Sequence, residues 1–316
     1  MIGDPAIAST LRAKLTLPVL AGPMFLVSGP ELVIGCCRAG IVGSFPTLNA
    51  RTPAILDEWL ATLSAELTAD AAPYAANLIV HPTNERLPDD LALLVRHKVP
   101  LVIASVGNPG PVVDQVHDYG GLVFSDVASV KHARRAAESG VDGLILLCAG
   151  SGGHTGWLNP FAFVTEVRKF FAGPLVLAGT ISNGHTIHVA EELGADFAYI
   201  GTPFIAATES MAEEDYRQML IDSCADDIEL TAALTGMPAN MLRQSIARSG
   251  FKPEAKHDGP FHAEKGTKAL RAWRDIWSAG QGVGDIDRAE PVASIVDRMK
   301  RDYDAARKAS LQRLGG

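Results

Sequence analysis

The chain has 316 residues, of which 47% are hydrophobic and 20% are charged, so it is long and apolar enough to bury a large core. The formal net charge of −8 argues against a general nucleic-acid binder, because such proteins present a basic surface to the phosphate backbone. It does not exclude a small anionic ligand, since glycine-rich turns and helix N-termini attract anions whatever the net charge.

The four cysteines do not form a pattern typical of a metal site. Two of them are adjacent, and none has a CxxC or Cys/His spacing that would indicate zinc. The first 18 residues lack a continuous apolar signal core, and no apolar run approaches the length of a membrane span. We therefore expect a cytoplasmic protein with no metal site and no membrane partner.

Short apolar runs alternate with helix-like segments over the first two thirds of the chain. The runs occupy residues 17–23, 41–47, 74–80, 100–107, 121–127, 143–150, 174–180 and 197–204. Most of them are almost wholly apolar, as expected for strands that are covered on both faces of a parallel sheet.

Helix signals lie between these runs. Residues 160–171 follow a candidate N-cap at Asn159 with Pro160 in the first turn, and residues 183–194 begin at Asn183 and end at Gly194. Eight such units predict an α/β protein with a (β/α)8 TIM barrel. A doubly wound sheet is the alternative, but eight units of near-equal length favour a closed barrel.

The remaining residues follow a different pattern. Apolar residues recur at helical spacing in two groups: Leu270, Trp273, Ile276 and Trp277, and then Val292, Ile295, Val296, Met299 and Tyr303. We expect a barrel over residues 1–206 and a helical extension over residues 207–316 that packs on the barrel and helps to close its site.

Two Gly-Thr pairs follow the last two predicted strands, Gly179-Thr180 and Gly201-Thr202. In a TIM barrel these loops commonly bind phosphate, through backbone N–H groups and a helix N-terminus. The alternative is that the pairs are only turn residues. We favour a phosphate-bearing ligand.

The stretch "CAGSGGHTGWL" at residues 148–158 surrounds His154 with glycines at the end of the sixth predicted strand. Glycines allow positive φ and the close approach of a flat ligand to the main chain. A lone histidine is usually structural, but beside a phosphate site this one is a candidate catalytic residue.

At these residues the sequence resembles the flavin-dependent nitronate monooxygenase family, formerly called 2-nitropropane dioxygenases. The resemblance covers most of the chain and is carried by the segments "AGPM" (21–24), "NLIVHPTN" (77–84), "AGSGGHTG" (149–156), "LAGTISNG" (177–184), "GADFAYIGTPFIAATES" (194–210), "TGMPANMLRQSI" (235–246) and "WSAGQGVG" (277–284).

The resemblance implies non-covalently bound FMN, with His154 as the catalytic residue. The implied cofactor-binding residues are Gly22, Pro23 and Met24 along the ring, Asn77, Gly152 and Gly153 against it, and Gly179, Thr180, Gly201 and Thr202 at the phosphate. Family members oxidise alkyl nitronates, such as propionate 3-nitronate, with O2 to a carbonyl compound and nitrite. The implied partners are a small nitronate or nitroalkane and O2, and a homodimer is an open alternative to a monomer.

One position departs from some relatives of the family. Where they have a lysine near the flavin, "VFSDV" places Asp126 at the end of the fifth predicted strand. A carboxylate would not stabilise an anionic reduced flavin as lysine would, although it could bind the N3–H of the ring. A role as a loop cap is the alternative, and we assign Asp126 to the cofactor site.

Two other functions remain as alternatives at this point. The first is an FMN-dependent NAD(P)H reductase of quinones or enoyl thioesters on the same scaffold, which needs no separate dinucleotide-binding domain. The second is a flavin-binding protein without catalysis, against which His154 in its glycine-rich loop argues.

Overall fold

The fold is described from a computed structural model in which residues 1–252 and 274–314 are placed well enough to describe. Eight parallel strands form one sheet in the order β1-β9-β8-β6-β5-β4-β3-β2. They are β1 (Val19–Ala21), β2 (Gly43–Pro46), β3 (Tyr74–Ile79), β4 (Leu101–Ser105), β5 (Leu122–Val127), β6 (Gly143–Leu147), β8 (Leu175–Ala178) and β9 (Phe197–Ile200). All eight lie within the predicted runs.

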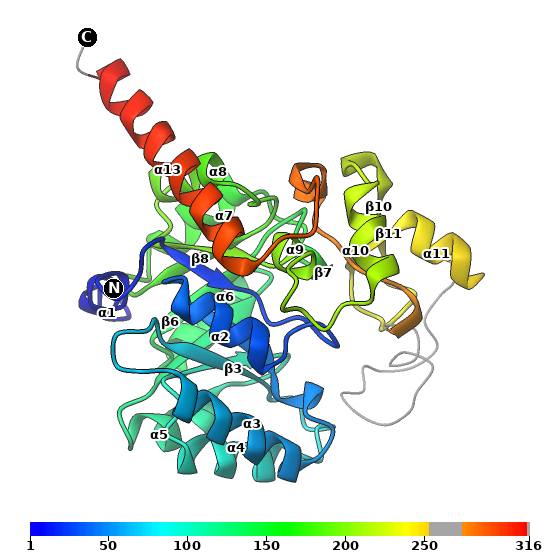
Figure 1. Ribbon diagram of the computed structural model, residues 1–316. Helices are drawn as coiled ribbons and strands as arrows, with labels where there is room; N and C mark the ends of the chain where they lie inside the picture. The colour runs from blue at the N-terminus through cyan, green and yellow to red at the C-terminus, as the bar shows by residue number, and fades with distance from the viewer. Residues whose placement is uncertain (253–273, 315–316) are drawn as a thin grey trace.

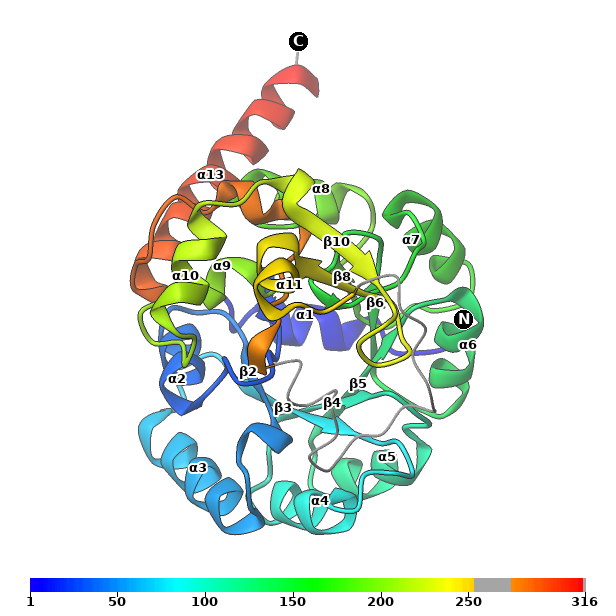
Figure 2. The ribbon, with the colours of Figure 1, turned by 90° about the vertical axis from the view of Figure 1, so that its right-hand side faces the viewer.

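The sheet closes on itself through its two outer strands. Leu20 in β1 forms a parallel bridge with Val42, which directly precedes β2, and the Ala21 N–H donates to the Val42 carbonyl at 2.8 Å. The expected (β/α)8 TIM barrel is therefore confirmed. Figure 2 shows the ring of strands with the helices around it.

The helices follow the strands in alternation. The barrel helices are α1 (Ala6–Arg12), α2 (Pro30–Arg38), α3 (Pro53–Glu66), α4 (Leu87–Arg96), α5 (Gly110–His117), α6 (Val130–Glu138), α7 (Pro160–Arg168), α8 (Gly184–Glu192) and α9 (Thr202–Ile205), with the 3-10 turn η1 (Thr47–Asn49). Two predicted caps are confirmed: the Asn159 side chain accepts from Phe161 N, and Asn183 forms a capping box with Thr186.

The chain after the barrel adds both helices and strands. They are α10 (Glu214–Ile221), η2 (Ala225–Asp227), β10 (Ile228–Thr231), β11 (Ala239–Leu242), α11 (Arg243–Ser249), η3 (Gln281–Asp285) and α13 (Val292–Leu314). Strands β10 and β11 form a second, antiparallel sheet together with β7 (Gly153–His154), which belongs to the barrel loop after β6.

Helix α13 packs on the outside of the barrel against α8 and α2 and continues beyond it (Figure 1). As predicted, Val292, Ile295, Val296, Met299 and Tyr303 form its buried face. They share a core cluster with barrel residues such as Ile187 and Ile200. The extension is thus joined to the barrel by a common apolar core.

The other predicted helical face, that of Leu270, Trp273, Ile276 and Trp277, has a different outcome. Leu270 and Trp273 lie outside the described residues. Ile276 and Trp277 are buried, but they follow the helical turn at 274–275 and pack in two separate clusters. The interpretation of one shared helical face was therefore wrong for these two residues. Within the described part of the chain, no helix is long and apolar enough to cross a membrane.

Candidate active site

A cavity of about 1170 Å³ opens at the carboxyl ends of the barrel strands. Its wall contains every residue that the sequence assigns to the site: Gly22, Pro23, Met24, Asn77, Asp126, Gly152, Gly153, His154, Gly179, Thr180, Gly201 and Thr202. These residues come from six different strand–helix units, so it is the barrel that brings them together. Their individual roles stay predictions.

His154 reaches the cavity from a short strand that is held by the extension. Its strand β7 pairs with β11, where His154 lies opposite Ala239, and its Nε2 lies 3.0 Å from the Thr235 hydroxyl. Burial lowers the pKa of His154 to about 4, because the charged imidazolium loses its hydration. The imidazole is therefore neutral at neutral pH, with one nitrogen able to accept a proton and one N–H able to donate.

The glycines around His154 have a second explanation besides ligand approach. A Cβ at Gly152 would lie 2.7 Å from the Gly280 nitrogen, and one at Gly156 would lie 2.1 Å from the Leu147 carbonyl oxygen. Side chains at these positions would collide with protein backbone. The motif is therefore required in part for the His154 loop to pack between strand β6 and the extension.

The first Gly-Thr pair has an unusual backbone, whereas the second pair lies at the start of helix α9. Thr180 has φ +58° and the preceding Gly179 has φ +129°, and positive φ at a threonine is strained. The Thr202 hydroxyl accepts a hydrogen bond from Gly280 N at 2.9 Å. Strained backbone of this kind is concentrated at functional sites.

The surroundings of the α8 N-terminus do not agree with the expectation that this end of the helix helps to bind the phosphate. The carboxylate of Asp285, in η3, accepts hydrogen bonds from the Ser182 hydroxyl and the Asn183 amide just before the helix. A protein carboxylate therefore already lies at this end of α8. Of the predicted phosphate-binding groups, the two Gly-Thr pairs themselves stay a prediction.

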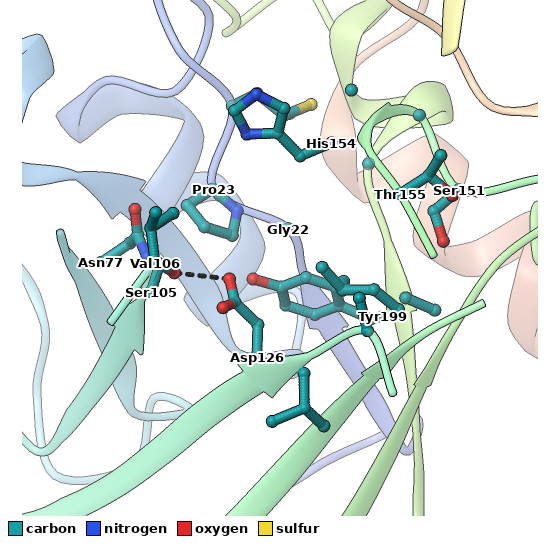
Figure 3. A pocket seen from close by; sticks show the side chains of 18 of the residues that line it. Gly22, Pro23, Asn77, Ser105, Val106, Asp126, Ser151, His154, Thr155 and Tyr199 are labelled. Atoms are coloured by element: carbon teal, nitrogen blue, oxygen red, sulfur yellow. Dashed lines mark hydrogen bonds between the residues drawn. The ribbon is translucent and has the colours of Figure 1, made fainter. Parts of the chain in front are cut away.

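Asp126 and Asn77 are joined by a serine that the sequence did not single out as a site residue. The Asn77 amide donates to the Ser105 hydroxyl at 2.6 Å, and this hydroxyl donates to Asp126 Oδ2 at 2.5 Å. The hydroxyl of Tyr199 points toward the same carboxylate from β9 (Figure 3). Burial raises the pKa of Asp126 to about 6.

Sequence reasoning missed several parts of the cavity wall, among them Tyr199, Thr235 and the segment Ser278–Gly280. Tyr199 lies within an apolar strand and looks like a core residue. Thr235 and residues 278–280 belong to the conspicuous segments "TGMPANM" and "SAGQG". Their glycines were a usable signal, but nothing in the sequence placed them at the barrel mouth.

Comparison with known proteins agrees with this architecture. A sequence model of the family described as nitronate monooxygenase matches residues 8–302. The nitronate monooxygenase of Paraburkholderia phytofirmans is 26% identical, and the match covers 94% of each chain. A 5-hydroxy-7a-methyl-1-oxo-octahydro-1H-indene-4-carboxyl-CoA dehydrogenase of Rhodococcus jostii is 25% identical over 82% of this chain and 76% of its own length.

Two solved structures share the fold over nearly the whole chain. FabK from Thermotoga maritima has a TM-score of 0.82 and 27% identity, covering 98% of both chains. Nitroalkane oxidase from Streptomyces ansochromogenes has a TM-score of 0.82 and 23% identity, covering 95% of this chain and 99% of its own. With the family match extending over both the barrel and the extension, the chain belongs to the nitronate monooxygenase family of oxidoreductases.

Proposed function

We propose that the protein oxidises alkyl nitronates, such as propionate 3-nitronate, with O2 to a carbonyl compound and nitrite, using non-covalently bound FMN. The observation that carries this proposal is a buried, neutral imidazole, His154, in the wall of the cavity that is also lined by the two Gly-Thr pairs. In such a site the Gly-Thr residues would bind the cofactor phosphate, and the imidazole would act on the substrate.

The residues that line the cavity support FMN as the cofactor. Gly179, Thr180, Gly201 and Thr202 would bind the phosphate through N–H and hydroxyl donors, so that no basic side chain is needed. Gly22, Pro23 and Met24 would line one side of the ring, and Asn77, Asp126, Gly152 and Gly153 would contact it. When bound, FMN supplies the one-electron chemistry through which O2 reacts with the nitronate.

His154 has two roles that its neutral form can perform. With a neutral nitroalkane, the unprotonated ring nitrogen removes the proton next to the nitro group. With a nitronate that is already formed, the ring N–H donates to a nitronate oxygen. In both cases the Thr235 hydroxyl, 3.0 Å from Nε2, restrains the orientation of the ring.

Anaerobic mixing with each of two electron donors tests the proposal. Purified protein that carries FMN is mixed with propionate 3-nitronate or with NADH, and the flavin absorbance is followed. We expect the oxidised flavin bands to decrease with the nitronate and to persist with NADH. A decrease with NADH alone would overturn the proposal. Flavin released by heating should be FMN and not FAD, because the two Gly-Thr pairs would bind one phosphate group.

A second candidate is an FMN-dependent NAD(P)H reductase of quinones or enoyl thioesters. The observation in its favour is that a 25% identical relative is named as a dehydrogenase of a coenzyme A thioester. The same mixing experiment separates the two functions, because only a reductase takes electrons from NADH. All four cysteines are free thiols, which agrees with the cytoplasmic location that we propose.

A further inference from the structure

The Asp126 carboxyl group lies in the cavity wall, and its accessible surface faces the cavity (Figure 3). It is near the carboxyl end of strand β5, and it accepts hydrogen bonds from the Ser105 hydroxyl and from the Val106 N–H. Both donors belong to the end of the neighbouring strand β4 and its loop. The carboxyl group is thus held in one orientation by its surroundings.

One of these donors requires a strained backbone. Val106 has φ +55°, a conformation that is strained for a β-branched residue. Such strain persists only where the surrounding structure maintains it, and it is concentrated at functional sites. Here it accompanies a main-chain N–H that is directed at Asp126.

Within the described part of the chain, no cation is among the groups that shift the Asp126 pKa, although Arg135 and His132 line the same cavity. Among the described residues no ion pair involves Asp126. The ionisable side chain that faces it is Tyr199 from β9, whose pKa is raised by burial and by the Asp126 charge. From β3 and β4 it is approached by the neutral groups Asn77 and Ser105. Burial raises the Asp126 pKa to about 6, and the two donors oppose that shift.

Burial and the two hydrogen-bond donors shift the pKa of Asp126 in opposite directions. A new negative charge in the cavity would raise this pKa further and favour protonation of the carboxylate. Two electrons and one proton would convert the neutral ring of FMN to an anion, and an uncompensated anion next to a carboxylate in a cavity of low dielectric is costly. A second proton on the carboxylate removes that repulsion. The total is then two electrons and two protons, with the electrons supplied by a chemical reductant.

We propose that Asp126 takes up a proton when the bound flavin is reduced, so that the cavity gains no net negative charge. This inference rests on the proposed FMN site and goes beyond it. It assigns to Asp126 a positioning and charge-balancing role instead of a direct part in substrate chemistry. It also gives a function to Asp126 at the position where some relatives have a lysine, since a group that accepts a proton would replace a permanently charged cation.

The test is the pH dependence of the midpoint potential of bound FMN in the holoprotein between pH 6.5 and 8. For a two-electron couple, one additional proton makes the potential fall more steeply by about 30 mV per pH unit. We expect this additional slope in the wild type and its loss in Asp126→Asn. The matched control is Asp142→Asn. It removes the same charge at the opposite end of strand β5, where Asp142 accepts from Val123 N. Equal slopes in wild type and Asp126→Asn would overturn the proposal.

Two further measurements do not depend on the Asp126 variant. The reduced-minus-oxidised infrared spectrum of the wild type should contain the carbonyl stretch of a newly protonated carboxyl group, and Ser105→Ala should shift its frequency. A spectrum without that band would contradict the proposal. A protein that binds no FMN would overturn the proposed function as well, whereas flavin-loaded protein with equal slopes would overturn this inference alone.

Discussion

The imidazole of His154 loses its charge through burial, and this decides what the residue can do. With a pKa of about 4, nearly every molecule has the neutral ring at pH 7. A neutral ring does not form an ion pair with a nitronate, so its contribution to binding is a hydrogen bond. It does retain a lone pair that can accept a proton from carbon.

Replacing His154 distinguishes the two roles. We expect His154→Ala to retain FMN and to lose turnover of neutral nitroalkanes by roughly 10²–10⁴-fold, as is typical of general-base catalysis. Oxidation of the matching preformed nitronate should decrease much less, because no proton has to be removed. The measurement is kcat/KM for the matched pair of substrates.

The control for this variant is His117→Ala, since His117 lies at the end of α5 and bonds to Asp142. Equal losses on both substrates in His154→Ala would mean that the histidine binds the anion and does not act as a base. Unchanged turnover of both would make it a structural residue.

The same pKa makes the stability of the protein depend on pH. The unfolded chain binds a proton on this histidine near pH 6.5, whereas the folded protein binds it only near pH 4. Between these values the unfolded state holds more protons, so acidification destabilises the fold. The contribution of His154 to this loss is at most about 3 kcal/mol.

Urea unfolding of the flavin-free protein at pH 7.5, 6 and 4.5 measures this effect. The difference in free energy of unfolding between wild type and His154→Ala should change in favour of the variant as the pH decreases. A difference that does not vary with pH would show that the histidine is protonated equally in both states.

At the scale of the elements, the position of His154 depends on the extension. Strand β7 pairs with β11, Thr155 N donates to the Pro238 carbonyl at 3.0 Å, and the Asn240 amide donates to the Ser151 carbonyl at 2.6 Å. The loop from Ser151 to Thr155 is therefore fixed from both sides. The barrel supplies the histidine, and the second sheet holds it in place.

Thr235 offers a test of this arrangement. Thr235→Val keeps the shape of the side chain and removes the hydroxyl, while Thr235→Ser keeps the hydroxyl. We expect the valine variant to lose roughly tenfold in kcat/KM, close to the value of one hydrogen bond, and to bind FMN normally. The serine variant should recover most of the activity. A valine variant with wild-type kcat/KM would show that the hydroxyl does not orient the ring.

Much of the fold could be predicted from the sequence because each barrel strand is an apolar run covered on both faces, and each run is followed by its own helix. Strands β10 and β11 carried no such signal, since "IELT" and "ANML" are short and mixed in polarity. The contact between His154 and Thr235 joins residues 81 positions apart, which no local pattern encodes. Ile276 and Trp277 have a spacing typical of a helix, but they are buried in different clusters.

At the scale of the whole molecule, barrel and extension share their apolar cores. One cluster joins Ile187 and Ile200 of the barrel to Val292 of α13, and another joins Val27 and Ile205 to Trp277. If one part unfolded alone, the apolar side chains of the other part in these clusters would be exposed to water, and the free energy of their burial would be lost. We therefore expect the two parts to unfold together.

Thermal unfolding followed by circular dichroism and by tryptophan fluorescence should give one coincident transition. FMN should shift the midpoint of this transition to a higher temperature. At a concentration of 100 times Kd, FMN should add about 2.7 kcal/mol to the free energy of unfolding. Gly201→Val is the matched variant. A Cβ there would meet the flexible side chain of Met24 at 3.4 Å, so the variant should fold but occupy cavity space.

FMN affinity in Gly201→Val should be more than tenfold weaker, a loss of at least about 1.4 kcal/mol, and the upward shift should decrease accordingly. Equal shifts in wild type and variant would place the phosphate elsewhere. Two separate transitions for the two probes would contradict the shared core.

The loop from Thr235 to Pro238 has a consequence for how such enzymes diversify. It forms part of the cavity wall beside His154, yet it belongs to the extension and contributes to none of the eight barrel strands. Substitutions in it can reshape the space around the reacting carbon while the phosphate turn and the barrel core stay as they are. Exchanging this loop between homologues is therefore a direct route to altered substrate selectivity, and the same freedom was open to natural selection.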